Sequence, residues 1–150
     1  MEIILPRPVE EEALAHLRAA YPNEGGGFLL GHRQDKQVTV LEVIPVANVF
    51  AAEEQYHRYA MRPEDWIALE DQAEGRGLTL VGYFHSHPDS PAVPSDYDRM
   101  HALPNFVYLI VQVDQGGVRA ARVWQLVEDR SRFEELSLIR PGAGDSLLTH

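Results

Sequence analysis

Cysteine is absent from this sequence of 150 residues, and its absence excludes a large group of sites. Disulfide frameworks, thiol nucleophiles, iron–sulfur clusters and zinc sites with cysteine ligands all require this residue. Any transition-metal site must therefore use histidine, aspartate or glutamate. A chain of this length buries roughly 70% of its unfolded surface, so its stability does not require a metal. A metal bound here would serve function.

Positive charge is also scarce. The sequence has 13 Lys and Arg against 23 Asp and Glu, which gives a formal net charge of −10 at pH 7. Lys36 is the single lysine. Binding to nucleic acid through phosphate contacts needs clustered Lys and Arg, so nucleic acid is not an expected partner.

Long apolar runs are missing as well. No window reaches the ~20 apolar residues of a membrane-spanning helix, and charge and proline interrupt the apolar stretch near the N-terminus. The sequence therefore predicts a soluble cytoplasmic protein that does not bind membranes, and the absence of cysteine fits that compartment.

Hydrophobic periodicity predicts a mixed α+β domain. Helices are expected at 8–21, 63–75 and 95–103, and strands at 3–5, 28–30, 38–44, 56–61, 78–84, 106–113, 118–127 and 133–139. The last strand is expected at a sheet edge, and turn residues at 33–36 and 114–117 predict two hairpins.

Proline, glycine and the tail give further local predictions. Pro45 is expected to end its strand. The glycine run 25–27 permits backbone geometries that are closed to other residues. Residues 1–140 are expected to form one domain, and 141–150 a flexible tail.

Two histidines follow the most apolar predicted strand. His85 and His87 lie two residues apart, and alternate residues of an extended segment project to the same face. Both imidazoles can therefore bind one ion. The pair alone is weak evidence, since the sequence has seven histidines and two can fall close together by chance.

Asp98 strengthens the case for a metal. The proline-containing loop 88–94 is long enough to fold the start of the third helix back over the histidines. Two neutral imidazoles and one carboxylate would leave zinc one open coordination position, as a catalytic site requires.

The tetrapeptide from Ser95 to Asp98 also has a purely structural interpretation. Serine at the N-cap followed by an acidic residue at the third helical position approximates a capping box. Asp98 is expected to serve either the cap or a metal, but not both. His101, one turn later, is an alternative ligand that we expect to stay off the metal.

Other families with a His-x-His pair fit less well. Cupins require a glutamate four or five residues after the second histidine, where this sequence has Pro91 and Ala92. The metallo-β-lactamase pattern requires a histidine three residues after it, where this sequence has Ser90.

The complete pattern resembles the JAMM (MPN+) metalloprotease family. Its signature is a glutamate in an early helix-to-strand loop, then His-x-His-Pro, seven residues and Ser-x-x-Asp. The sequence carries Glu24 before the glycine run, His85-Ser86-His87-Pro88, and Ser95-Asp96-Tyr97-Asp98 at that spacing. The order of elements matches over roughly residues 1–130. The one departure is glycine at 25–26, where relatives often carry a cysteine in a packing position.

This resemblance implies a fold and a set of roles. The fold would be a mixed, largely antiparallel sheet flanked by helices and similar to that of cytidine deaminases. His85, His87 and Asp98 would bind zinc, Glu24 would be the general base, and Ser95 would donate a hydrogen bond to the developing oxyanion. Elementary chemistry supports these roles, since zinc acidifies a bound water and a neighbouring carboxylate can take its proton.

The resemblance also implies a reaction and a partner. The protein would hydrolyse the bond after the C-terminal Gly-Gly of a ubiquitin-like or sulfur-carrier protein. Its association into a homodimer is left as an open alternative. Two alternatives remain. A non-catalytic MPN-type scaffold would lack members of the Glu, His, His, Ser and Asp set, which is complete here. A RadC-like role on DNA is disfavoured by the net charge of −10.

Overall fold

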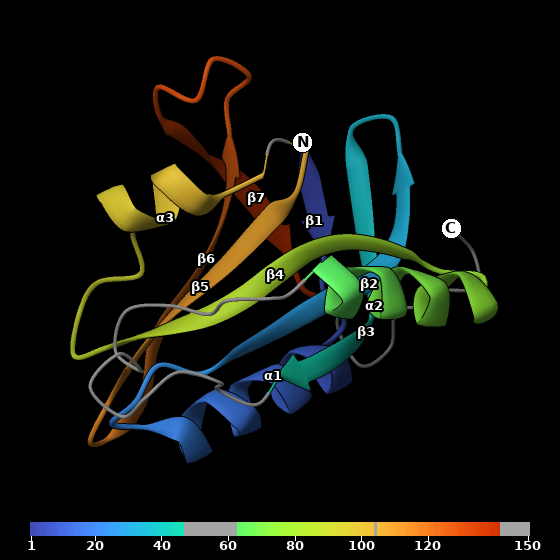
Figure 1. Cartoon of the computed structure of the whole chain (residues 1–150). Helices are drawn as coiled ribbons and strands as arrows, with labels where there is room; N and C mark the ends of the chain where they lie inside the picture. The colour runs from blue at the N-terminus through green and yellow to red at the C-terminus, as the bar shows by residue number, and fades with distance from the viewer. Residues whose placement is uncertain (47–62, 104, 142–150) are drawn as a thin grey trace.

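The computed structural model describes residues 1–46, 63–103 and 105–141, and confirms a mixed α+β fold that is dominated by a sheet (Figure 1). In these residues the helices are α1 (Arg7–Ala20), α2 (Pro63–Gly75) and α3 (Asp96–His101). The strands are β1 (Glu2–Ile4), β2 (Gly26–Gln34), β3 (Gln37–Val46), β4 (Thr79–Pro88), β5 (Val107–Asp114), β6 (Gly117–Leu126) and β7 (Phe133–Ile139). Both predicted hairpins, β2–β3 and β5–β6, are confirmed.

The strands close into a barrel in the order β1-β3-β2-β4-β5-β6-β7. Strand β1 closes it, because it pairs in parallel with both β3 and β7. The pair β4–β5 is also parallel, whereas β2–β3, β2–β4, β5–β6 and β6–β7 are antiparallel. The prediction that 133–139 forms an edge strand is wrong, since β7 has β6 on one side and β1 on the other.

The two faces of β2 are buried by different helices. Leu29 belongs to the core cluster that includes Ala13 and Leu17 of α1. Phe28 and Leu30 point to the opposite face and pack with Ala73 of α2. Because alternate residues of a strand face opposite sides, a helix on each side explains the continuous apolar run of β2.

The glycine run is needed for space and not for special backbone geometry. Strand β2 begins at Gly26, two residues before the predicted start. Among the described glycines a positive φ occurs only at Gly77 and Gly117, so the run 25–27 does not use the freedom that glycine permits. A Cβ atom on Gly25 would lie 2.8 Å from the Ala20 Cβ, and one on Gly27 would lie 2.4 Å from the Ile44 carbonyl oxygen.

Proline does not end β3 as expected. Pro45 lies within the strand, which continues to Val46, and pairs with Gly27 of β2. Only 37–39 of β3 pair with β1, so among the described strands Pro45 has a neighbour on the β2 side alone. A residue without an N–H group is tolerated at such a position.

Strand β4 is longer than the sequence predicts. It lies between β2 and β5, and its parallel pairing with β5 continues to Pro88 opposite Val113. His85 and His87 therefore lie within the strand and not after it, where a partner on the β5 side holds their backbone in register.

Two predictions fall outside the described residues. These are the strand at 56–61 and nearly all of the tail at 141–150. Within the described part of the chain, no helix is long and apolar enough to cross a membrane.

Candidate metal centre

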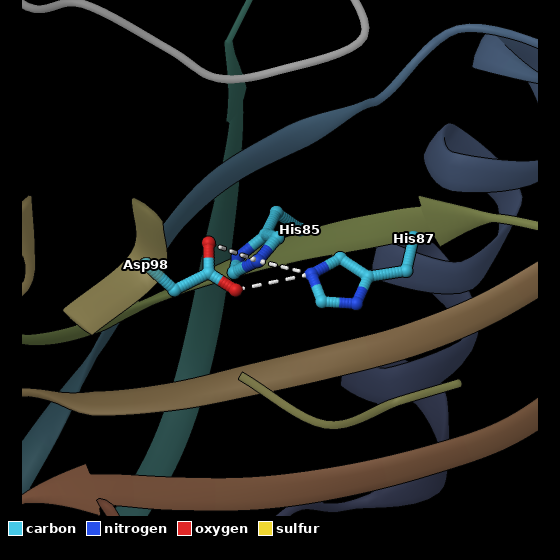
Figure 2. A group of neighbouring side chains, drawn as sticks. All are labelled: His85, His87 and Asp98. Carbon is cyan, nitrogen blue, oxygen red and sulfur yellow. Dashed lines mark hydrogen bonds and ion pairs between the residues drawn. The ribbon is translucent and has the colours of Figure 1, made fainter. Parts of the chain in front are cut away.

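The two histidines of β4 bring their ring nitrogens close together. The Nε2 atoms of His85 and His87 are 3.2 Å apart, and Figure 2 shows both rings turned toward the same point. This arrangement follows from the alternation of side chains along a strand, as the sequence predicts. His85 is buried, and His87 is partly exposed.

A carbonyl group sets the protonation of the His87 ring. His87 Nδ1 lies 2.9 Å from the Pro91 carbonyl oxygen, which can only accept a hydrogen bond. The Nδ1 atom is therefore the protonated nitrogen, and in the neutral ring Nε2 keeps its lone pair. A metal-binding histidine commonly has this tautomer, with its other nitrogen bonded to a carbonyl or carboxylate.

The Asp98 carboxylate completes the cluster from α3. Its Oδ1 lies 3.3 Å from His85 Nε2, and its Oδ2 lies 3.1 Å from His87 Nε2 (Figure 2). The loop after β4 is thus long enough to bring α3 back over the histidines, as the sequence predicts. These three residues are the group among the described side chains that could hold a metal ion.

Asp98 also closes the capping box, which corrects an expectation from the sequence. The Ser95 backbone N–H donates to Asp98 Oδ2 at 2.9 Å, and the Asp98 backbone N–H donates to Ser95 Oγ at 3.0 Å. We expected Asp98 to serve either the cap or a metal, and the structure shows the carboxylate in the cap while it also contacts both histidines. A carboxylate has lone pairs for both, and the cap fixes the rotamer that faces the histidines.

The spacing of the three side chains fits a tetrahedral ion. Zinc bound at about 2.0–2.1 Å holds its ligand atoms at tetrahedral angles, which places them about 3.3–3.4 Å apart. The two imidazole nitrogens, 3.2 Å apart, are close to this value. His85 Nε2 lies 3.3 Å from Asp98 Oδ1 and His87 Nε2 lies 3.1 Å from Asp98 Oδ2, so the carboxylate reaches the two nitrogens through different oxygens. Neutral imidazole nitrogens and a carboxylate oxygen are also the ligand types that zinc accepts without cysteine.

The electrostatics of the cluster favour positive charge between the three side chains. Burial alone would raise the pKa of the Asp98 carboxyl, but the charge of His85 and hydrogen bonds with His85, His87 and the Ser95 amide hold it well below its usual range. Burial alone would lower the pKa of His87, but its bonds to Asp98 and to the Pro91 carbonyl raise it. At neutral pH Asp98 is therefore ionised, which is the form that binds a cation.

The backbone before β2 is tied to the strand that carries the histidines. The Ser86 backbone N–H donates to the Gly25 carbonyl at 3.0 Å, and the Gly25 N–H donates to Ser86 Oγ at 2.9 Å. Ser86 is fully buried, and Glu24, which directly precedes Gly25, is only 7% exposed. The segment with Glu24 is thereby held beside His85 and His87.

The Ser86→Ala variant tests the strength of this link. Removing the hydroxyl leaves the buried Gly25 N–H without its acceptor, which should lower the free energy of unfolding by about 1–3 kcal/mol. Chemical denaturation measures the change. Ser90→Ala is the control, since Ser90 is exposed and the bond it makes uses its backbone amide. An unchanged unfolding free energy in Ser86→Ala would show that the link adds no net stability.

The loop between β4 and α3 is fixed on several sides. The Trp124 indole N–H donates to the Ala92 carbonyl at 3.1 Å, and the Asp89 N–H donates to the Val113 carbonyl at 2.8 Å. Tyr21 donates its hydroxyl to the Asp89 carboxylate at 2.9 Å, across from the end of α1. These bonds hold the loop to β5, β6 and the connection that leads to Glu24.

Sequence reasoning found the main residues of the cluster and missed its supports. It placed His85, His87, Asp98 and Ser95 in one site, and the structure brings these residues together. It did not single out Ser86 or Trp124. A signal for Ser86 was present in the sequence. Ser86 lies between two histidines that share a face, so its side chain must point to the opposite face, where a buried hydroxyl needs a hydrogen-bond partner. His101 ends α3, and its side chain lies outside what the structure describes.

Fold and cluster together define a class of protein, a small α+β domain with a His, His and Asp metal-binding motif on a central strand and a capped helix. A sequence profile described as prokaryotic homologs of the JAB domain matches residues 6–127. The chain belongs to this family, and the JAMM-type resemblance predicted from the motifs is confirmed.

Two related proteins and one solved structure agree with this assignment. The chain is 35% identical over 139 residues to a desampylase of Haloferax volcanii, which covers 89% of this chain and 93% of the relative. It is 36% identical over 118 residues to a protein of Thermus thermophilus named "Probable TtuB-protein conjugate cleaving protease". This match covers 79% of this chain and 74% of the relative. A solution structure of a protein from Desulfitobacterium hafniense superposes with a TM-score of 0.78 at 28% identity and covers 94% of this chain and 93% of that one.

Proposed function

We propose that this protein is a zinc-dependent isopeptidase that hydrolyses the bond after the C-terminal Gly-Gly of a ubiquitin-like or sulfur-carrier protein. The observation that carries the proposal is the cluster itself: the two histidine nitrogens lie 3.2 Å apart, a separation that suits a tetrahedral ion, and the Asp98 carboxylate lies within 3.3 Å of both. The named relatives support the reaction class, since their names describe cleavage of such conjugates.

Zinc held by His85, His87 and Asp98 would act as a Lewis acid and would activate water at neutral pH. To bind this ion, the two histidines would offer nitrogen lone pairs, and Asp98 would offer an oxygen lone pair and one negative charge. The His87 tautomer and the capped rotamer of Asp98 prepare both residues for this task.

Glu24 is the proposed general base. Strand β2 pairs with β4 as far as Gly26 opposite His85, so continuing the register by two residues would bring Glu24 opposite His87. A Cβ atom on Gly25 would point at Leu17 and Ala20 of α1, so Glu24, one residue earlier, is expected on the other face with the histidines. A carboxylate there can take a proton from water and return it to the leaving amine.

Ser95 is the proposed donor to the oxyanion. Its Oγ accepts the Asp98 amide hydrogen, and a hydroxyl that accepts one hydrogen bond can still donate its own hydrogen. Ser95 is exposed, so a substrate carbonyl can reach it. One fixed donor of this kind contributes roughly 10²–10³ in rate.

The substrate part of the proposal is tested with two β-grasp fusion proteins. One ends in Gly-Gly before the scissile bond, and the other has Val-Val in the same place. Glycine lets the extended backbone approach the metal and Ser95 closely, so valine should lower kcat/KM on the order of 10²-fold. A fusion with valines placed farther from the scissile bond is the control. Equal cleavage of both tails, or rapid hydrolysis of unrelated peptides, would make this protein a general peptidase.

Several finer points belong to the same proposal. We retain a cytidine-deaminase-like sheet, a cytoplasmic location and a homodimer as predictions. The division into a domain at 1–140 and a tail at 141–150 is retained in the same way. The partner is a protein with a Gly-Gly tail, and neither nucleic acid nor membrane is part of the proposed function.

A further inference from the structure

The helix that carries Asp98 has little support of its own. Helix α3 spans six residues, Asp96–His101, and helices this short do not persist in water without outside contacts. At its C-terminal end Met100 is 65% exposed and Leu103, just beyond the helix, is 43% exposed, and of Met100, Ala102 and Leu103 only Ala102 is buried. Hydrogen bonds from other parts of the chain must therefore hold it.

One side chain provides three such bonds at the C-terminal end of the helix. Arg130 lies between β6 and β7. The turn that joins these two strands lies beside α3 (Figure 1). Its Nη1 donates to the Ala102 carbonyl at 2.9 Å, and its Nη2 donates to the carbonyls of Arg99 and Met100 at 3.1 and 3.0 Å. The last carbonyls of a helix have no partner within the helix, and a cation is favourable beside them.

The contact between the turn and the helix is reciprocal. The Arg99 side chain donates to the Arg130 backbone carbonyl at 3.3 Å. Arg130 itself has a φ of +64°, a conformation that costs free energy for any residue other than glycine. The turn keeps arginine at a position where glycine would be less strained, which indicates that the side chain is needed.

We propose that Arg130 is a positioning residue for the metal centre: its guanidinium holds the C-terminal end of α3 and thereby keeps the Asp98 carboxylate against His85 and His87. The capping box fixes the N-terminal end of the helix, and Arg130 fixes the other end. This inference rests on the metal site proposed above.

The proposal and a simple charge effect predict opposite results. Arg130 is a cation, and removing a cation from the neighbourhood of a metal site should tighten metal binding by Coulomb's law. Loss of the support for α3 should weaken it, because Asp98 would then spend less time in the binding position. Supporting contacts behind metal ligands commonly contribute 10–100-fold in metal affinity.

Arg130→Gly is the variant of choice because glycine relieves the positive φ and removes only the side chain. The zinc dissociation constant of the full-length protein is measured by competition with a chromophoric chelator, well below the melting temperature. Visible absorption of the Co²⁺ form reports whether Asp98 remains bound. Arg132→Ala is the matched control, since it also removes one positive charge from this turn, and its partner Glu134 is on the surface.

We expect Arg130→Gly to bind zinc about tenfold more weakly with a changed Co²⁺ spectrum, and Arg132→Ala to match the wild type. Equal or tighter binding in Arg130→Gly overturns the inference while leaving the proposed function intact. A wild-type protein that binds no zinc overturns the proposed function, and the inference with it. Should Arg130→Gly not fold, Arg130→Lys tests the same statement, because one ammonium cannot reproduce the fork to three carbonyls, and unchanged affinity there overturns it.

Discussion

Replacing Glu24 by glutamine should leave the fold and the zinc content unchanged and lower turnover by roughly 10²–10⁴-fold. Glutamine has nearly the same shape as glutamate, so the buried position of Glu24 tolerates it, but an amide cannot accept the proton of the attacking water. Turnover of a Gly-Gly fusion, zinc content and melting temperature measure the three parts of this expectation.

The matched control is the other buried glutamate among the described residues, Glu10, which forms an ion pair with Arg140 at 2.7 Å. Glu10→Gln weakens this ion pair and should lower the melting temperature without changing kcat. The two variants thus separate a catalytic carboxylate from a structural one. Turnover at the wild-type rate in Glu24→Gln would remove Glu24 from the mechanism.

The second large effect is expected at the metal itself. The wild-type protein should hold about one zinc per chain, and His85→Ala, His87→Ala or Asp98→Ala should each lose most of it because each removes one of three protein ligands. Zinc is measured by elemental analysis after dialysis against a weak chelator. Asp98→Asn can still accept the Ser95 amide through its side-chain oxygen, so its loss of zinc would reflect the lost charge and not the lost cap.

Asp96→Ala is the control for Asp98, since Asp96 is an exposed acid in the first turn of the same helix. It should keep its zinc, and so should His101→Ala. Full zinc content in Asp98→Ala would leave this residue with the capping role alone. Loss of zinc in His101→Ala would instead assign the third ligand to the next turn.

What the sequence predicts well here is local. The hairpins, α1, α2 and the His-x-His pair each depend on residues close together in the chain, where side-chain period and turn chemistry are visible. The Ser95 and Asp98 pattern was also visible, but its two interpretations were treated as exclusive. Only the geometry shows that one carboxylate makes both sets of contacts.

What the sequence could not predict depends on distant pairing. The closure of the barrel requires β1 to lie between β3 and β7. The three residues of β1 carry no sequence signal that predicts two neighbouring strands. For the same reason the position of Pro45 inside a strand depends on its pairing with Gly27, which lies far from it in the sequence. The role of Arg130 is equally hidden, because the carbonyls that it binds belong to a helix some thirty residues earlier in the chain.

The pairing of Glu2 with Ser137 also has a consequence for the order of folding. Contacts between residues so far apart in sequence form slowly, because the entropy of closing the intervening chain is lost before the contact is gained. During synthesis β7 leaves the ribosome long after β1, and the turn with Arg130 leaves only shortly before β7. Strand β4 and both histidines are synthesised before this turn. Helix α3 can therefore form its contacts with Arg130 only after the turn has left the ribosome. Metal affinity is therefore expected to develop late, after the turn with Arg130 has formed its contacts with α3.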